Sequence, residues 1–302
     1  MKVLITGKNG QLGSELQKNC PSNVELICFG SKELDISNVE QVNELLISNS
    51  PDIVINAAAY TAVDKAETDV DQAYAVNKQG AANLANVCKH INAKLIHIST
   101  DFVFDGTSTL PYTASDATNP LGVYGASKLA GEQAINEALG SQAIIVRTAW
   151  VYSVFGNNFV KTMLRLMSEK EQLGIVGDQV GTPTWAAGLA NMLWALVAKT
   201  SDNTINEQHS SANNSLILNW TDAGVASWYD FAVAIQELAV EQGLLSKAIP
   251  ISAIPAASYP TPAKRPAFSV LNKAQAEELS GVKTVHWRAQ LKAMLTELKA
   301  QA

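Results

Sequence analysis

The sequence contains little of several features that mark particular classes of protein. It has only three cysteines in 302 residues, Cys20, Cys28 and Cys88, and they show no CxxC or other metal-ligand spacing. This scarcity excludes a disulfide framework and predicts a reducing compartment. Basic residues are also in the minority, since 28 acidic residues outweigh 22 basic ones and leave a net charge of −6. A mainly electrostatic nucleic-acid binder is therefore not expected.

Long uncharged apolar runs are absent as well, and the chain opens on MKVLITG without a charged leader. We therefore expect no signal peptide, no membrane partner and a cytoplasmic protein. What is present fits a globular enzyme, with 47% hydrophobic and 17% charged residues. The length allows one large domain or two modest ones.

The first half of the chain alternates short apolar runs with longer helical patterns. Several of the runs lack in-and-out alternation, which is typical of parallel strands buried on both faces. The predicted strands are Lys2–Thr6, Val24–Cys28, Ile53–Asn56, Lys94–Ser99 and Ala143–Arg147. The predicted helices lie near Gln11–Asn19, Val39–Ser48, Asp71–His90 and Tyr124–Leu139. This repetition predicts an α/β fold with a Rossmann-type, doubly wound parallel sheet.

We assign residues 1–150 to a dinucleotide-binding domain, to which later segments return, and residues 151–302 mainly to a smaller substrate-binding lobe. Helices are predicted there at Asn157–Ser168, Trp185–Lys199, Ser227–Glu241 and Val285–Leu298. The polar stretch Ser201–Asn219 predicts an exposed loop. Five of the ten prolines fall between Pro250 and Pro266, which predicts an ordered, extended strap or a loop.

A glycine-rich turn follows the first predicted strand directly. The residues from Gly7 to Gly13 read GKNGQLG, a GxxGxxG pattern between a strand and a helix. Glycines allow a tight turn and close approach of the backbone to a pyrophosphate, and the helix N-terminus then offers free N–H groups. The pattern predicts a dinucleotide site; the alternative is a strand–helix turn that is merely rich in glycine.

The ends of the second and third strands refine this prediction. The second ends in Phe29-Gly30-Ser31-Lys32, without the carboxylate that usually binds the adenosine ribose. Ser31 and Lys32 suit a 2′-phosphate, so we predict NADPH, with NADH possible. Asp35 is expected either to accept from the adenine amine or to cap the next helix. After the third strand, Ala57, Ala58 and Ala59 would let a flat ligand lie against the backbone, although packing alone also explains them.

A tyrosine and a lysine four residues apart form the predicted catalytic pair. Tyr124 and Lys128 share one helix face, and an ammonium close to a phenol lowers its pKa from about 10. Such a phenol can protonate the oxygen of a ketone during hydride reduction. YxxxK alone is frequent on solvated helices, but here it follows a strand that ends in Ser99-Thr100-Asp101, where Thr100 can hydrogen-bond a carbonyl.

These motifs resemble the extended short-chain dehydrogenase/reductase superfamily and, more narrowly, the dTDP-4-dehydrorhamnose reductase family. The matching segments are Gly7–Leu16, Asn56–Glu67, Ser99–Gly106, Tyr124–Glu132, Arg147–Tyr152, Gly156–Leu166 and Tyr259–Pro266. The resemblance implies reduction of the 4-keto group of dTDP-4-dehydro-L-rhamnose to dTDP-L-rhamnose, with NADPH as cofactor and a dTDP-sugar as the binding partner.

The resemblance and the residue chemistry together give the site residues we expect. The catalytic residues are Thr100, Tyr124 and Lys128. The cofactor contacts are Gly7, Gly10, Gln11, Leu12, Ser31, Lys32, Asp35, Ile36, Ala57, Ala58, Ala59, Tyr60, Thr61, Tyr124 and Lys128. The substrate contacts are Thr100, Asp101, Trp150, Asn158 and Arg265. Arg265 is expected to face the diphosphate, and Trp150 is alternatively a core aromatic.

Some departures and alternatives bear on these predictions. Some members of the family are described as dimers joined through a magnesium ion that carboxylates hold. Glu15 is present here, but Trp185–Leu193 has no carboxylate to join it. We therefore expect no required metal, and a monomer or homodimer. Related dehydratases resemble one another in a Glu after Ser-Thr-Asp, where this chain has Phe102. Epimerases and dehydratases usually carry the acidic residue that is missing after the second strand. A non-catalytic, NADP-binding regulatory subunit of the methionine adenosyltransferase type is a further alternative.

Overall fold

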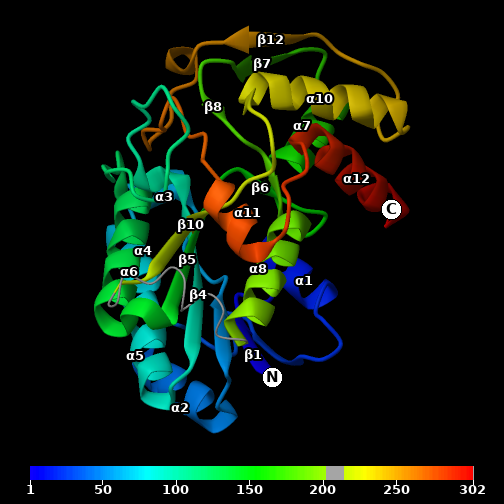
Figure 1. Ribbon diagram of the computed structural model, residues 1–302. Helices are drawn as coiled ribbons and strands as arrows, with labels where there is room; N and C mark the ends of the chain where they lie inside the picture. Colours follow the sequence, from blue (N-terminus) through cyan, green and yellow to red (C-terminus); the bar gives the residue numbers. More distant parts are fainter. Residues whose placement is uncertain (202–213, 302) are drawn as a thin grey trace.

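The computed structural model describes residues 1–201 and 214–301. Figure 1 shows a parallel sheet with helices on both faces and, at one end of it, a smaller group of elements that includes α7, α10, α12, β7 and β12. No helix in the described part is long and apolar enough to cross a bilayer.

The sheet has six parallel strands in the order β10-β5-β4-β3-β1-β2. They are β1 Lys2–Thr6, β2 Glu25–Phe29, β3 Ile53–Asn56, β4 Lys94–Thr100, β5 Ala143–Thr148 and β10 Leu216–Asn219. Leu4 of β1 lies between Ile27 of β2 and Val54 of β3, so the strand order reverses at β1. Such a switch point opens a crevice at the carboxyl ends of the strands. The predicted doubly wound α/β fold is confirmed.

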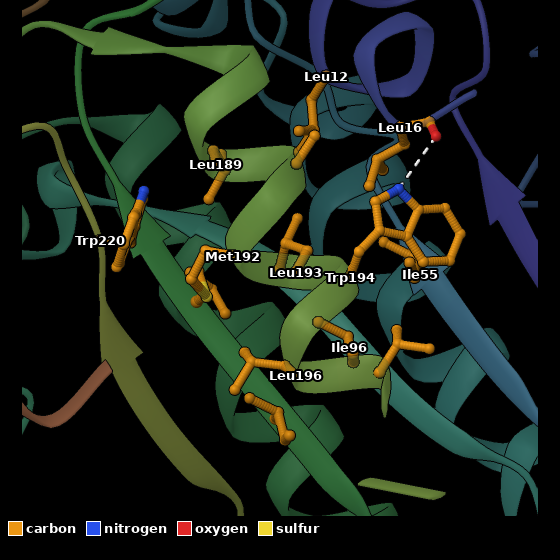
Figure 2. Packing of buried hydrophobic residues seen from close by; sticks show 14 of the residues in the cluster. Leu12, Leu16, Ile55, Ile96, Leu189, Met192, Leu193, Trp194, Leu196 and Trp220 are labelled. Atoms are coloured by element: carbon orange, nitrogen blue, oxygen red, sulfur yellow. Dashed lines mark hydrogen bonds between the residues drawn. The ribbon is translucent and has the colours of Figure 1, made fainter. Parts of the chain in front are cut away.

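Alternate strand residues bury opposite faces of the sheet, which produces the layers. Val3 and Ile5 pack on one side against α1, α8 and α11, whereas Leu4 and Val54 pack on the other side against α2, α5 and α6. Figure 2 shows the α8 layer, where Trp194 Nε1–H donates to the Leu16 carbonyl at 3.1 Å. The helices are α1 Gln11–Lys18, α2 Val39–Asn49, α3 Val63–Ala66, α4 Val70–Tyr74, α5 Ala81–Ile91, α6 Val123–Leu139, α8 Ala186–Ser201 and α11 Ala274–Ser280.

A third core lies outside the sheet layers, where Tyr152, Phe231 and Trp287 meet among the helices of the smaller lobe. Its helices are α7 Phe159–Glu169, α10 Trp228–Glu241 and α12 Trp287–Ala300. Its short strands are β6 Val151–Tyr152, β7 Leu173–Val176, β8 Val180–Gly181, β9 Thr184–Trp185, β11 Ala226–Ser227 and β12 Ile251–Ile254. The capping box of Ser227 and Asp230 starts α10, as expected for a helix that leaves a short strand.

Two predictions about the chain need correction. The stretch Ser201–Asn219 is not one exposed loop, because Leu216–Asn219 pairs in parallel with β5 as the edge strand β10; residues 202–213 lie outside the described residues. The apolar segment has only four residues and follows a polar run, so its sequence alone does not identify it as a strand. The predicted helix Asp71–His90 is interrupted by a π-helical turn over Ala75–Gly80, where Asn77 turns inward to bond the backbone of Tyr60.

Candidate active site

A cavity of about 890 Å³ lies at the carboxyl ends of β1, β3, β4 and β5. Its size suits a sizeable organic ligand. The predicted site residues that line it are Gly7, Gly10, Gln11, Leu12, Ser31, Asp35, Ile36, Ala57, Ala58, Ala59, Tyr60, Thr61, Thr100, Asp101, Tyr124, Lys128 and Trp150. Lys32, Asn158 and Arg265 are not among the lining residues.

Close backbone packing shapes the glycine-rich end of the cavity. Gly7 has φ of +72°, and a Cβ there would lie 2.7 Å from the Ala58 nitrogen. A Cβ on Gly13 would lie only 2.2 Å from the Gly7 carbonyl oxygen. Both positions therefore require glycine. Helix α1 starts at Gln11 with no side-chain cap from Gly10, so its first N–H groups remain available toward the cavity.

The residues after β2 include Ser31, which lines the cavity, and Glu33, whose carboxylate is already hydrogen-bonded within the protein. Ser31 lines the cavity, whereas the neighbouring Lys32 is exposed. Glu33 accepts from Lys8 Nζ at 2.8 Å and from the Gly30 amide at 2.9 Å, and these two hydrogen bonds lower the pKa of its carboxyl. The carboxylate closest to this strand end is thus held by the protein itself.

Asp35 lines the cavity and is not the cap of α2. Its Oδ1 accepts from the backbone N–H of Ser37 at 2.9 Å, and the N-cap of α2 is Asn38, which accepts from the Gln41 amide. Of the two expectations for Asp35, helix capping is therefore wrong.

Tyr124 stands at the start of α6 beside the end of β4. Its ring meets Phe102 edge to face, with 5.5 Å between ring centroids. Burial raises the pKa of Tyr124 to about 12, a hydrogen bond with Thr100 opposes this, and the charge of Asp101 adds to it. Lys128 is not among the causes of this shift, so burial raises the pKa of the phenol where the spacing predicted a lowering.

Lys128 lies one turn further along the same face of α6 and is 2% exposed. Its Nζ donates to the Ile98 carbonyl at 2.6 Å and lies 3.2 Å from Nε2 of His97. Burial lowers the pKa of Lys128 to about 8, while the charge of Glu132 raises it. Lys128 therefore faces the sheet as well as the cavity.

Thr100 and Asp101 extend from the end of β4 into the same cavity. Thr100 Oγ1 donates to Asp101 Oδ1 at 3.1 Å and accepts from the Phe102 amide at 3.2 Å. Burial raises the pKa of Asp101 to about 6, and hydrogen bonds with Ser269 and Thr100 oppose the shift. Ser269 belongs to the second half of the chain, so this carboxyl joins both lobes.

A buried ion pair supports α6 on the side away from the cavity. Arg147 of β5 donates to both oxygens of Glu132 on α6, at 3.0 and 2.7 Å. Ser99 Oγ also donates to Glu132, and the Arg147 guanidinium lies 5.1 Å from the ring centroid of Phe104. These contacts tie α6, β4 and β5 together next to Tyr124.

Trp150 lines the cavity in a strained conformation. Its φ of +48° is unusual for a bulky residue, and its ring stacks on Trp228 with centroids 3.5 Å apart and planes at 9°. A Cβ on Gly181 would lie 2.9 Å from Cε2 of the Trp150 ring. Trp150 is thus held in a slot between Trp228 and Gly181. It is half-buried, and it packs against the core of the smaller lobe as well as lining the cavity.

Two predicted substrate contacts have protein partners at the edge of the site. Asn158 caps α7 by accepting from the Lys161 amide, and its Nδ2 donates to Gln11 Oε1 at 3.0 Å. Arg265 makes a two-bond ion pair with Asp64 of α3, at 3.0 and 2.8 Å. Both side chains therefore contact residues of the first part of the chain, Gln11 and Asp64.

Several residues that line the cavity were not predicted from the sequence. Leu34, Val63, Val76 and Leu189 are apolar and carry no chemical signature, so nothing in the sequence separated them from core residues. Gly156 and Asn157 lie in the segment Gly156–Leu166, which had been recognised only as a match. Among the described residues, no group of three or more His, Cys, Asp and Glu side chains is placed to hold a metal ion.

Known proteins are similar in sequence to this chain along nearly its whole length. Residues 1–300 match the family model described as RmlD substrate binding domain. A dTDP-4-dehydrorhamnose reductase of Aggregatibacter actinomycetemcomitans is 41% identical over 293 residues, 96% of this chain and 97% of that protein. The protein of the same name from Escherichia coli strain K12 is 38% identical over 302 residues, 99% of this chain and 98% of its own.

Solved structures agree with these matches. The dTDP-4-dehydrorhamnose reductase of Clostridium acetobutylicum is 40% identical with a TM-score of 0.89, over 99% of this chain and 100% of that one. That of Bacillus anthracis, solved in complex with NADP, is 34% identical with a TM-score of 0.87, over 98% and 99%. The resemblance drawn from the motifs is confirmed: the chain belongs to the dTDP-4-dehydrorhamnose reductase family.

Proposed function

We propose that this protein reduces the 4-keto group of dTDP-4-dehydro-L-rhamnose to dTDP-L-rhamnose with NADPH. One observation carries the proposal: the Tyr124 phenol, Thr100 and Lys128 lie on the same cavity as the glycine-rich turn at Gly7. Family membership over the full length supports the sugar-nucleotide substrate, and the relative from Bacillus anthracis, solved with NADP, supports the cofactor.

The residues present fit a dinucleotide. Gly7 and Gly13 leave a backbone cradle that any Cβ would fill, and the free N–H groups of α1 suit a pyrophosphate. Ser31 on the cavity wall and Lys32 beside it would hold a 2′-phosphate, since the nearby Glu33 carboxylate is neutralised by Lys8. NADPH, when bound, supplies the hydride that is added to the carbonyl carbon.

The chain's own residues supply the proton and the orientation. Because the pKa of Tyr124 is about 12, the phenol stays protonated at neutral pH and is ready to donate to the ketone oxygen as that oxygen gains charge. Thr100 would provide a second donor to the same oxygen by turning its one hydroxyl proton from Asp101 to the ketone. One proton from Tyr124 and one hydride complete the alcohol.

The rest of the substrate would lie toward the second lobe. We assign Asp101 to the sugar hydroxyls, because its buried carboxyl is ionised above a pKa of about 6, and Trp150 to the face of the sugar or base. Arg265 would contact the diphosphate while it is paired with Asp64, and Asn158 would position Gln11 at the cavity.

The side chain after Asp101 favours a reductase over the related dehydratases. Phe102 lies edge-on against Tyr124 and has no group that can move a proton. The three polar residues Thr100, Tyr124 and Lys128, all on the cavity, favour catalysis over a purely binding role. We further propose a cytoplasmic monomer or homodimer, consistent with the three free cysteines and the net charge of −6.

The test follows NADPH absorbance with dTDP-glucose and the enzymes that dehydrate and epimerise it, with and without this protein. We expect NADPH to be consumed in proportion to the keto sugar only when the protein is present, with dTDP-rhamnose as product. NADPH binding without any oxidation would overturn the proposal in favour of a binding subunit. Conversion of the sugar without net NADPH consumption would indicate an epimerase.

A further inference from the structure

A buried chain of polar side chains lies behind Lys128 and takes no part in the chemistry described above. It crosses β1, β3, β4 and α6. Thr6 Oγ1 donates to Asn56 Oδ1 at 2.7 Å, Asn56 Nδ2 lies 2.9 Å from His97 Nδ1, and His97 Nε2 lies 3.2 Å from Lys128 Nζ. All four residues are at most 2% exposed, so no solvent competes for these contacts.

The orientation of Asn56 is fixed by its neighbours. Its Oδ1 accepts from Thr6 Oγ1 and also from the backbone N–H of Ala58, at 3.1 Å. A backbone N–H can only donate, so the atom that faces Ala58 must be the amide oxygen. The amide NH₂ therefore points to His97 and donates to its Nδ1. This ring nitrogen must carry a lone pair.

The proton of His97 is placed by the same reasoning. Complete burial is the main cause that lowers the pKa of His97 well below its ordinary value, so the ring is neutral. A neutral imidazole has one N–H, and with Nδ1 accepting from Asn56 that proton is on Nε2. Nε2–H then faces Lys128 Nζ. If Lys128 is a neutral amine, its lone pair can accept this hydrogen. If it is an ammonium, its N–H group and the N–H of His97 face each other, and neither can accept.

We propose that His97 is a positioning residue for Lys128: its fixed tautomer presents an N–H to the amine and so favours the neutral amine over the ammonium. The role in reduction rests on the proposed function, whereas the tautomer is a property of the folded chain alone. Other ionisable groups surround this pair, and Glu132, which favours the ammonium, is already held by Arg147. These groups are Tyr124 and Glu132 on α6, Asp101 after β4 and Arg147 on β5.

A measurement without substrate or cofactor tests the tautomer. We expect ¹⁵N-histidine NMR of the intact protein to show His97 with its proton on Nε2 from pH 6 to pH 9. His97→Gln identifies its signals among those of the four histidines. A proton on Nδ1, or a doubly protonated ring in this range, would overturn the proposal whether or not the protein reduces a sugar.

An isosteric substitution tests the effect on Lys128. Asn56→Asp keeps the oxygen that faces Thr6 and Ala58 but replaces the donor to His97 with an acceptor. The His97 proton then moves to Nδ1, and Nε2 offers a lone pair to the ammonium. The new carboxylate also favours the ammonium by its charge, so His97→Gln, which adds no charge, is the decisive variant. His97→Gln acts in the same direction, because its amide can turn an oxygen toward Lys128.

Both variants should raise the pH at which Lys128 loses its proton, which lies near 8 in the unchanged chain. We expect a shift of about one pH unit, the equivalent of one hydrogen bond, in the alkaline limb of the kcat profile. His90→Gln, on the exposed side of α5, should leave the profile unchanged. Unaltered profiles in both folded test variants would refute the role; if neither variant folds, the NMR result decides.

Discussion

The two ends of the cavity differ in the atoms that line them, which are mainly backbone at one end and mainly side chains at the other. At the glycine-rich end the walls are backbone, since Gly7 lies against Ala57 and Ala58 and the first turn of α1 presents its amides. At the Tyr124 end the walls are buried side chains such as Lys128 and Asp101, and the properties of Lys128 depend in turn on His97 behind it. A backbone site depends on the space that glycine leaves, whereas a side-chain site depends on charge and hydrogen bonding. Substitutions should therefore affect the two ends differently.

The largest effect is expected from Tyr124→Phe. Removing the phenol oxygen takes away the proton donor and leaves the glycine-rich end untouched, so kcat should fall by about 10²–10⁴-fold. The Kd for NADPH, measured by fluorescence titration, should change less than about twofold. Turnover close to that of the unchanged protein would exclude Tyr124 as the acid. A comparable loss of NADPH affinity would show that the two ends are not independent.

Gly7→Ala should give the converse result. The new Cβ would lie 2.7 Å from the Ala58 nitrogen at a φ of +72°, so the turn must move. We expect the Kd for NADPH to rise at least about tenfold and the free energy of unfolding to fall by about 1–3 kcal/mol. Gly10→Ala is the matched control, since its Cβ meets a single atom at 3.3 Å and its φ is −78°. Equal effects of the two variants would contradict the steric argument.

A smaller effect is expected from Trp228→Leu, which removes the ring stacked on Trp150. An aromatic pair contributes about 0.5–1.5 kcal/mol beyond its buried area, so KM for the dTDP-sugar should rise by about 2–10-fold. The Kd for NADPH should stay constant, because Trp228 does not line the cavity. Trp228→Phe should restore most of the loss. An unchanged KM in the leucine variant would show that the stacking of Trp228 on Trp150 does not contribute to substrate binding.

The smallest effect is expected from Lys32→Glu. Lys32 is exposed beside Ser31, so solvent screens its charge, and we expect the preference for NADPH over NADH to fall only about 3–10-fold. The ratio of kcat/KM for the two cofactors measures this preference. Lys247→Glu, an exposed lysine in the second half of the chain, is the control. If the ratio for the two cofactors is unaltered, Lys32 does not bind the 2′-phosphate, and Ser31 and the backbone are the groups that remain to bind it.

The sequence was sufficient for five of the six strands of the sheet, because their signals are local. Lys2–Thr6 and Ile53–Asn56 are strands with the predicted bounds, since a buried parallel strand is a continuous apolar run between polar turns. Leu216–Asn219 was missed because its place at the sheet edge depends on β5, which lies about 70 residues earlier in the chain. Such pairing has no signature in four residues.

The same distinction applies to the site. The residue types of Tyr124, Lys128 and Thr100 were readable from their spacing, and the structure places all three on one cavity. Their charge states were not readable. The pKa of Tyr124 rises instead of falling because the phenol is buried. Lys128 contacts Ile98 and His97, and no pattern near YxxxK indicates that histidine. Ionisation in a buried site is set by contacts across the fold.

The return of β10 to the sheet also limits how this protein can be dissected. A fragment that ends near residue 150 would lose β10 and α8 together, exposing the edge of β5 and the apolar face that Leu193 and Trp194 cover (Figure 2). An uncovered strand edge beside an apolar surface promotes aggregation. The sheet with its helices is therefore a spatial unit that is not encoded by one continuous stretch of the gene, and truncation is a poor way to isolate it.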